Sequence, residues 1–196
     1  MLKIGLTGNI GSGKTTLAKV FKVLDIPIYS ADYEAKKFLA HADVLSKLYQ
    51  NFGEGIMTNG RIDRKKLSDL VFADPASLQF LNQLIHPLIK TDFENWLKLM
   101  PKDCPYIILE AAILFESGFD QYVDKTILVS SPQNICIQRV VARDKVSEAD
   151  VMKRMNNQWD EDRKRKLSNY EIVNDEHRLL IPQLLEIHNS LISDKG

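Results

Sequence analysis

Short apolar runs recur along the chain, and segments in which apolar residues have helical spacing separate them. Continuous runs of this length are typical of strands buried in a parallel sheet. The expected strands are Leu2–Thr7, Ile26–Ser30, Tyr106–Glu110, Lys125–Val129 and Glu171–Asn174. Because helical segments lie between them, the order predicts an α/β fold with a doubly wound, mostly parallel sheet of about five strands.

Segment 41–104 breaks this alternation, because it shows helical spacing and no strand pattern. Asp63 is expected to cap one helix, and Asp74, followed by a proline, is expected to open another. We expect His86-Pro87 to interrupt that second helix, since proline lacks the N–H group and clashes with the preceding turn. A crossover between parallel strands needs only about a dozen residues plus loops, so 41–104 is predicted to be a helical insert at the ligand edge of the sheet.

Two helices are expected between the last two strands. Ser131 is expected to cap the first of them, with Pro132 at the first helical position. Ser147 starts a pattern that resembles a capping box, so it is expected to begin the second helix. That second helix is expected to carry Arg154 and Gln158.

The first strand and the first helix are joined by a loop that fits G-x-x-x-x-G-K-[ST], the pattern of a phosphate-binding loop in this context. Its glycines let the backbone approach phosphate oxygens, and its N–H groups and the helix N-terminus point at the anion. Lys14 can reach the β- and γ-phosphates of ATP, and the Thr15 hydroxyl can ligate Mg²⁺. A plain glycine-rich turn would not need every fixed position of the pattern. The predicted ATP-binding residues of this loop are Gly8, Asn9, Ile10, Gly11, Ser12, Gly13, Lys14, Thr15 and Thr16.

Two carboxylates lie where expected strands end, at the sheet edge where ligands bind in open α/β folds. Asp32 opens a helix directly after the strand that ends at Ser30, and Glu110 ends another strand. Asp32 is a candidate catalytic carboxylate, although on position alone a helix N-terminal residue favoured by the dipole is the simpler interpretation. Glu110 is a candidate Mg²⁺ ligand, and a solvated strand-end carboxylate explains its position equally well.

Segment 139–166 is rich in Lys and Arg. Arg139 and Arg143 are spaced i and i+4, so they lie on one helix face. Taken by itself, such a run is most often a solvated helix face with ion pairs. In a protein with a phosphate-binding loop, however, arginines of a lid commonly neutralise the charge of the transferring phosphoryl group. We therefore expect a lid at 139–166, with Arg139 and Arg143 as catalytic residues.

The composition limits which partners are expected. Lys plus Arg and Asp plus Glu number 26 each, so the formal net charge is +0, which argues against bulk nucleic-acid binding. The two cysteines lack metal-ligand or CxxC spacing, so neither a metal site nor a disulfide framework is expected from them. No apolar run approaches the ~18 residues of a membrane span, and no signal sequence precedes the first strand. These features predict a cytoplasmic protein without membrane or nucleic-acid partners.

Further motifs separate the classes of nucleotide-binding protein. A GTPase should contain Asn-Lys-x-Asp, and this tetrapeptide does not occur in the sequence. A dinucleotide-binding protein needs another glycine three residues after Gly13, where this chain has Thr16. A motor or transport ATPase would normally be longer. A small kinase with an insert and a lid fits best, so 1–196 is predicted to be a single P-loop kinase domain with a nucleotide-binding core at 1–40 and 105–196.

Beyond the phosphate-binding loop, several short elements follow one another in an informative order. They are Ser30-Ala31-Asp32, Gly60–Arg64 with Leu67, Val71 and Phe72, Leu84–Leu88, Leu114-Phe115-Glu116, Arg139, Arg143-Asp144, Gln158 and Val173-Asn174. Together with the loop, these elements resemble the dephospho-CoA kinase family, and the resemblance covers nearly the whole chain. The loop alone is common to many kinases, whereas the later elements in this order are much more specific.

The resemblance implies a kinase that uses ATP to phosphorylate the ribose 3′-hydroxyl of dephospho-CoA, giving coenzyme A and ADP. It implies that Asp32 accepts or orients that hydroxyl and that Arg139 and Arg143 close over the phosphates. It places Asn174 beside the adenine of ATP. The residues that it implies for the acceptor pocket are Arg64, His86, Leu114, Phe115 and Glu116. For His86, a histidine that caps or packs the insert is an equally good interpretation.

Three positions depart from the pattern of the family. Asn9 stands where the family usually has glycine, at a variable position of the loop. Glu110 and Ala112 stand where the family often has Asp and Pro, and the longer Glu110 changes the reach toward Mg²⁺. Two alternative functions are another small-metabolite or nucleoside kinase and a P-loop module that senses ATP without turnover. The intact Lys14, Thr15 and Asp32 speak against the sensing module.

Overall fold

The structure is a computed structural model that describes residues 1–193, apart from the side chains of Arg64 and Phe72. The chain divides into two compact units. The first unit consists of Met1–Ala31 and Lys98–Gly196, and the second consists of Asp32–Leu97. The second unit contains most of the predicted insert 41–104, although both of its boundaries lie earlier in the chain. Among residues 1–193, no helix is long and apolar enough to cross a membrane.

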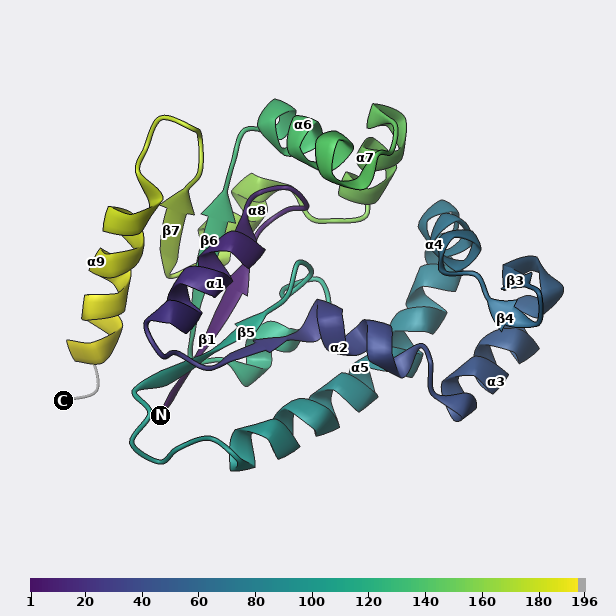
Figure 1. The fold of residues 1–196 in the computed structure, drawn as a ribbon, viewed down its shortest axis with the longest axis horizontal. Coiled ribbons are helices and arrows are strands. Elements are labelled where there is room, and N and C mark those ends of the chain that lie inside the picture. The colour runs from purple at the N-terminus through teal and green to yellow at the C-terminus, as the bar shows by residue number, and fades with distance from the viewer. Residues whose placement is uncertain (194–196) are drawn as a thin grey trace. The chain divides into compact units, whose positions relative to one another are not determined.

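The first unit is built on a five-stranded sheet in the order β2-β5-β1-β6-β7, in which all neighbouring strands are parallel (Figure 1). The strands are β1 (Leu2–Thr7), β2 (Ile28–Ser30), β5 (Tyr106–Glu110), β6 (Lys125–Ser130) and β7 (Tyr170–Val173). β1 therefore lies at the centre of the sheet, between two strands that come much later in the sequence. The predicted parallel α/β sheet is confirmed, with small differences at the strand ends.

Besides the sheet, the first unit contains helices. They are α1 (Lys14–Val23), α6 (Gln133–Asp144), α7 (Glu148–Met155), α8 (Glu161–Leu167) and α9 (Leu180–Ser193), and a 3₁₀ turn spans Phe119–Tyr122. Phe21 of α1 and Leu184 of α9 belong to one apolar cluster with Ile4 and Leu6 of β1. Alternate residues of a strand face the same side of a sheet, so α1 and α9 cover the same face (Figure 1).

Helices also dominate the second unit. Its elements are α2 (Ala31–Phe38), α3 (Ala42–Phe52), the 3₁₀ turn Gly53–Ile56, β3 (Met57–Thr58), β4 (Arg61–Ile62), α4 (Arg64–Ala73) and α5 (Pro75–Lys98). The two short strands form an antiparallel hairpin, so the predicted absence of strands from 41–104 is wrong. Asn59 and Gly60 join the strands with φ angles of 52° and 70°. Two consecutive residues with positive φ are what a tight hairpin turn favours.

α5 is one helix of 24 residues with Pro87 in its interior, so the predicted interruption at this proline is wrong. Ile85, Ile89 and Phe93 are buried at helical spacing on both sides of Pro87. Burying this apolar stripe stabilises the continuous helix by more than the missing backbone hydrogen bond costs.

Local capping signals place most of the helix starts correctly. The carboxylates of Asp63 and Asp74 accept hydrogen bonds from backbone N–H groups at the starts of α4 and α5, and the Ser147 hydroxyl does the same for α7. Pro132 is the residue before α6 and not its first residue, because its ψ of 135° is extended and not helical. The prediction that α7 carries Gln158 is wrong, because Gln158 lies in the turn after this helix.

Candidate active site

The predicted phosphate-binding loop joins β1 to α1 and has a conformation that favours glycine at two tightly packed positions. Gly11 and Gly13 have φ angles of 84° and 101°. A Cβ added to Gly11 would lie 2.5 Å from the carbonyl oxygen of Cys136, and one added to Gly13 would lie 2.4 Å from Asn174 Nδ2. The loop is therefore packed closely against α6 and the end of β7. Asn9, which stands in place of a glycine, has no positive φ and so adds no backbone strain.

Lys14 begins α1 and folds its side chain back over the loop. Its Nζ donates hydrogen bonds to the carbonyl oxygens of Gly8 at 2.7 Å and Asn9 at 3.3 Å, and the residue is 7% exposed. A buried ammonium group needs such partners to offset the loss of water. The positive charge therefore lies against the loop, where an anion bound by the loop N–H groups would meet it.

The Thr15 hydroxyl donates a hydrogen bond to Glu110 Oε1 at 2.8 Å, so the two predicted Mg²⁺ ligands lie side by side. Glu110 ends β5 and pairs in register with Leu6 of β1, so the sheet holds its buried carboxylate beside the loop. Mg²⁺ takes few protein oxygens and completes its shell with water and substrate phosphates, a requirement that this pair fits. Among residues 1–193, no group of three or more His, Cys, Asp or Glu residues offers a fuller metal site.

Asp32 is an exposed residue in the first turn of α2. The preceding strand, β2, ends at Ser30, which pairs in register with Glu110. The chain thus leaves the sheet beside the candidate Mg²⁺ ligand and reaches Asp32 immediately afterwards. A carboxylate in this place is also favoured by the helix dipole, so its catalytic role stays a prediction.

Arg139 is connected to the phosphate-binding loop through Asn174. Its guanidinium donates to Asn174 Oδ1 and to Glu176 Oε1, each at 3.2 Å. Asn174 Nδ2 in turn donates to the carbonyl oxygen of Ser12 at 2.7 Å. One end of the Asn174 amide is therefore bound to the loop and the other to the arginine. Its position beside adenine stays a prediction.

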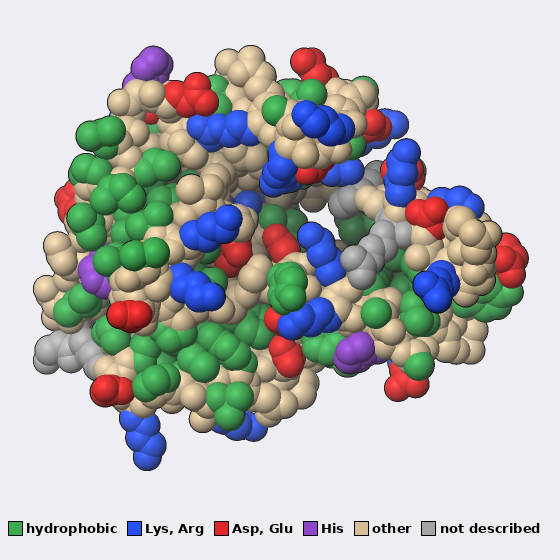
Figure 2. Space-filling view, in the orientation of Figure 1, with side chains coloured by type: hydrophobic (Ala, Val, Ile, Leu, Met, Phe, Trp, Pro, Cys, Tyr) green, Lys and Arg blue, Asp and Glu red, His purple; other side chains and the backbone are tan. Residues whose placement is uncertain are grey.

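Arg143 lies one helical turn after Arg139 but has different partners. It donates to the two oxygens of Asp144 at 2.6 and 3.0 Å, and Arg154 donates to the same carboxylate at 3.3 Å. The hydrogen bond from Arg143, together with the charge of Arg154, holds the pKa of Asp144 below its ordinary value. Figure 2 shows Lys and Arg side chains gathered over α6 and α7, with acidic side chains among them. The two predicted lid arginines thus share a helix but not a set of contacts.

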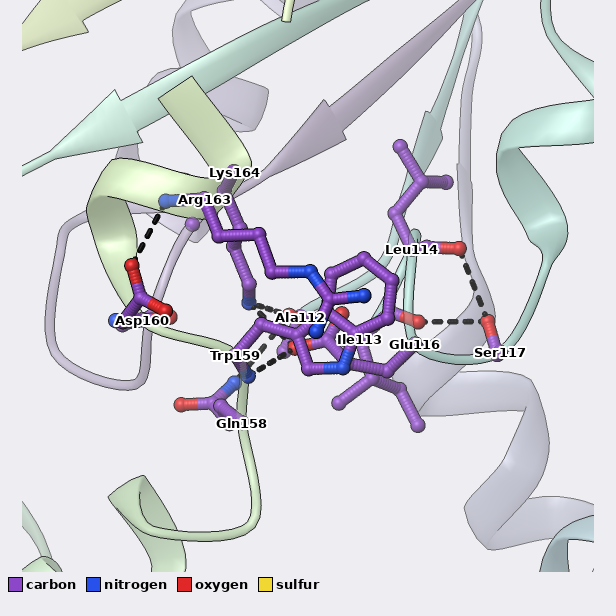
Figure 3. A network of polar contacts seen from close by, with 12 residues as sticks. Ala112, Ile113, Leu114, Glu116, Ser117, Gln158, Trp159, Asp160, Arg163 and Lys164 are labelled. Carbon is purple, nitrogen blue, oxygen red and sulfur yellow. Dashed lines mark hydrogen bonds and ion pairs between the residues drawn. The ribbon is translucent and has the colours of Figure 1, made fainter. Parts of the chain in front are cut away.

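The acceptor residues predicted after β5 are packed inside the first unit. Leu114 is fully buried, and Phe115 is 8% exposed. Glu116 Oε1 accepts a hydrogen bond from the Trp159 N–H and forms an ion pair with Lys164 Nζ, both at 2.8 Å (Figure 3). Leu114 therefore presents no side-chain surface in this conformation, and Glu116 is the ion-pair partner of a buried lysine. Contact of these residues with an acceptor stays a prediction.

The other two acceptor residues, Arg64 and His86, belong to the second unit. The side chain of Arg64 lies outside the described residues. His86 is half-buried in α5, and burial lowers the pKa of its imidazole, which favours the neutral ring. A neutral ring can accept a hydrogen bond from a substrate or pack within the unit, and both interpretations remain.

Lys164 and the contacts of Gln158 were not predicted. Lys164 stands among several Lys and Arg residues of α8, a pattern that indicates a solvated helix, yet it is fully buried. No local signal separates it from its exposed neighbours, because its burial depends on the distant Glu116. Gln158 accepts a hydrogen bond from the N–H of Ile10, within the loop, at 2.9 Å. The match of Gln158 to the family pattern was the only sequence signal that pointed to a role for this residue.

Comparison with known proteins identifies a family and relatives that this chain resembles in sequence. The family model described as dephospho-CoA kinase matches residues 2–179. A dephospho-CoA kinase from Bacteroides fragilis is 37% identical over 188 residues, which cover 95% of this chain and 91% of that protein.

Solved structures share the fold of this chain. A Thermus thermophilus structure has a TM-score of 0.83 at 30% identity and covers 98% of this chain and 97% of that chain. Dephospho-CoA kinase from Campylobacter jejuni has a TM-score of 0.69 at 24% identity, covering 99% and 98% of the two chains, which shows the shared fold.

Proposed function

The chain belongs to the dephospho-CoA kinase family, and on that premise we propose that it uses ATP to phosphorylate the ribose 3′-hydroxyl of dephospho-CoA, giving coenzyme A and ADP. The observation that carries the proposal is the Thr15–Glu110 contact beside a glycine loop onto which Lys14 is already folded. These groups combine an anion-binding loop, a positive charge and a pair of oxygens suited to Mg²⁺. Phosphoryl transfer needs all three close together.

The loop holds ATP by its phosphates in this proposal. Its N–H groups and the N-terminus of α1 bind the phosphate oxygens. Lys14 exchanges the carbonyl oxygens of Gly8 and Asn9 for oxygens of the β- and γ-phosphates. Thr15 and Glu110 would hold Mg²⁺, which would supply positive charge beside the ATP phosphates.

Asp32 orients the acceptor hydroxyl and receives its proton in this proposal. The 3′-oxygen forms a bond to the γ-phosphorus while the bond from that phosphorus to the bridging oxygen breaks. ADP leaves with the electron pair of the broken bond, and the hydroxyl proton passes to the carboxylate. Hydrogen-bond reach is the main requirement on this carboxylate, because positioning and charge neutralisation dominate phosphoryl transfer.

Arg139 and Arg143 neutralise the transferring group in this proposal. Arg139 is already aligned with the loop by Asn174, whereas Arg143 has to exchange Asp144 for phosphate oxygens. The helical insert 41–104 supplies the acceptor pocket. Its predicted contribution includes Arg64 and His86, with Leu114, Phe115 and Glu116 added from the first unit.

Purified protein with ATP, Mg²⁺ and dephospho-CoA tests the proposal. We expect ADP and coenzyme A to form in equal amounts, separated by chromatography, and a Lys14→Met control to lose this turnover. Absence of coenzyme A above background would refute the proposed reaction. ADP release that requires a nucleoside or another hydroxyl acceptor would indicate a different small-metabolite kinase. ATP binding without turnover for any acceptor would indicate a sensing module.

A further inference from the structure

The turn between α7 and α8 is held by polar contacts that the proposed chemistry does not use (Figure 3). The half-buried side chain of Gln158 makes two of them. Its Oε1 accepts a hydrogen bond from the Ile10 N–H at 2.9 Å, and its Nε2 donates one to the Ala112 carbonyl oxygen at 3.3 Å. A backbone N–H only donates and a carbonyl oxygen only accepts, so these partners determine which way round the amide lies.

The two partners of Gln158 belong to different parts of the candidate active site. Ile10 lies within the phosphate-binding loop. Ala112 lies just after β5, whose last residue is the candidate Mg²⁺ ligand Glu110. One side-chain amide therefore bridges the loop that would hold ATP and the segment that carries the metal carboxylate.

A buried ion pair fixes the turn from which the Gln158 side chain extends. Lys164 is fully buried, and its Nζ donates a hydrogen bond to Ala112 O at 2.9 Å and forms an ion pair with Glu116 Oε1 at 2.8 Å. Trp159, the residue after Gln158, donates its N–H to the same Glu116 oxygen at 2.8 Å. Buried groups with several hydrogen bonds restrict local motion, so the Gln158 side chain extends from a well-fixed turn.

We propose that Gln158 is a positioning residue that sets the placement of the phosphate-binding loop relative to the Glu110 carboxylate. The proposal rests on the proposed function of the same site, because that placement aligns ATP with its Mg²⁺. Gln158 acts through Ile10 and Ala112 and touches no reacting group. A misplacement of about 1 Å near a reacting centre costs on the order of 10²-fold in rate, so a single bridging amide is sufficient to matter.

Gln158→Met tests this role, because methionine keeps the length of the side chain and removes both hydrogen bonds. We expect kcat to fall about 10- to 100-fold and the Mg²⁺ concentration for half-maximal activity to rise. KM for dephospho-CoA should stay near the wild-type value. The matched control is Asn157→Ala, since the Asn157 amide donates to the Lys153 carbonyl oxygen at the end of α7. Unchanged kcat and Mg²⁺ dependence in Gln158→Met, or an equal loss in Asn157→Ala, would overturn the role.

Gln158→Glu adds a pH profile that a purely structural contact would not produce. An ionised carboxylate can accept from Ile10 but cannot donate to Ala112, whereas a protonated carboxyl group can do both, as glutamine does. Activity of this variant relative to wild type should therefore recover as the pH falls. A ratio that does not change with pH would contradict the proposed bridge.

Nucleotide binding separates this role from the proposed reaction. Affinity for MgATP can be measured by displacement of a fluorescent ATP analogue, without any acceptor. If the wild-type protein makes no coenzyme A, the proposed reaction fails, yet Gln158→Met should still bind MgATP more weakly than wild type and Asn157→Ala. Equal affinities of the three proteins would overturn the positioning role even if coenzyme A is formed.

Discussion

Replacing Lys164 with methionine should destabilise the protein strongly, because a buried carboxylate loses its cation. Lys164 Nζ lies 2.8 Å from Glu116 Oε1, and the two side chains are 0% and 11% exposed. At an effective dielectric constant of about 20, two unit charges at this distance attract by about 6 kcal/mol. Part of this attraction offsets the cost of removing both charges from water. Breaking such a pair from one side costs about 3–5 kcal/mol, which is the loss we expect for Lys164→Met.

The double variant Lys164→Met with Glu116→Gln distinguishes the ion pair from simple packing. Glutamine can still accept the hydrogen bond from the Trp159 N–H, and no charge is left buried alone, so the double variant should be more stable than Lys164→Met. The free energy of unfolding can be measured by urea titration followed by circular dichroism. A loss of less than about 1 kcal/mol for Lys164→Met, which is typical of an exposed ion pair, would contradict the buried-pair explanation. A double variant that is less stable than Lys164→Met would contradict it as well.

Other variants address the chemistry and the insert. Asp32→Asn should keep ATP affinity and lose about 10²- to 10⁴-fold in kcat, measured at steady state with dephospho-CoA; near-normal kcat would remove Asp32 from the chemistry. Arg143→Ala should lower kcat with less than about 1 kcal/mol change in unfolding free energy, since the Arg143 side chain is 62% exposed. An unchanged kcat would leave Arg143 a structural role. Burial lowers the pKa of His86, so the unfolded chain binds more protons below about pH 6.5 and stability falls as the pH falls through that range. His86→Gln should lose less stability in urea titrations between about pH 7 and pH 5, and an equal loss would argue against this linkage.

Local sequence patterns were sufficient to predict the strands of the main sheet and the phosphate-binding loop. All residues of β5 are buried, as its apolar run predicts, and the loop glycines lie where the motif requires them. The short hairpin had a strong turn signal in Asn59-Gly60, but strands of 2 residues each are too short to show alternation. The helix break at Pro87 was predicted from local chemistry alone, and the apolar stripe around it overrides that chemistry.

Contacts between distant parts of the chain could not be predicted in the same way. Ile10 and Gln158 are 148 positions apart, and Ala112 and Lys164 are 52 positions apart. A glutamine in a turn and a lysine in a basic helix carry no periodic signal, because their environment is made by segments far away in sequence. The resemblance to a family drew attention to Gln158 but did not reveal which groups it bonds.

The central position of β1 has a consequence for synthesis of the chain. β1 leaves the ribosome before its two sheet neighbours, which begin at Tyr106 and Lys125. At about 5–20 residues per second, roughly 5–20 s pass before β5 has been made. During that interval the nascent chain carries an apolar strand without a partner, so we expect it to rely on the ribosome surface or chaperones for protection. ATP can then assist folding only after Gln158 and Asn174 have been made, since their side chains hydrogen-bond the loop.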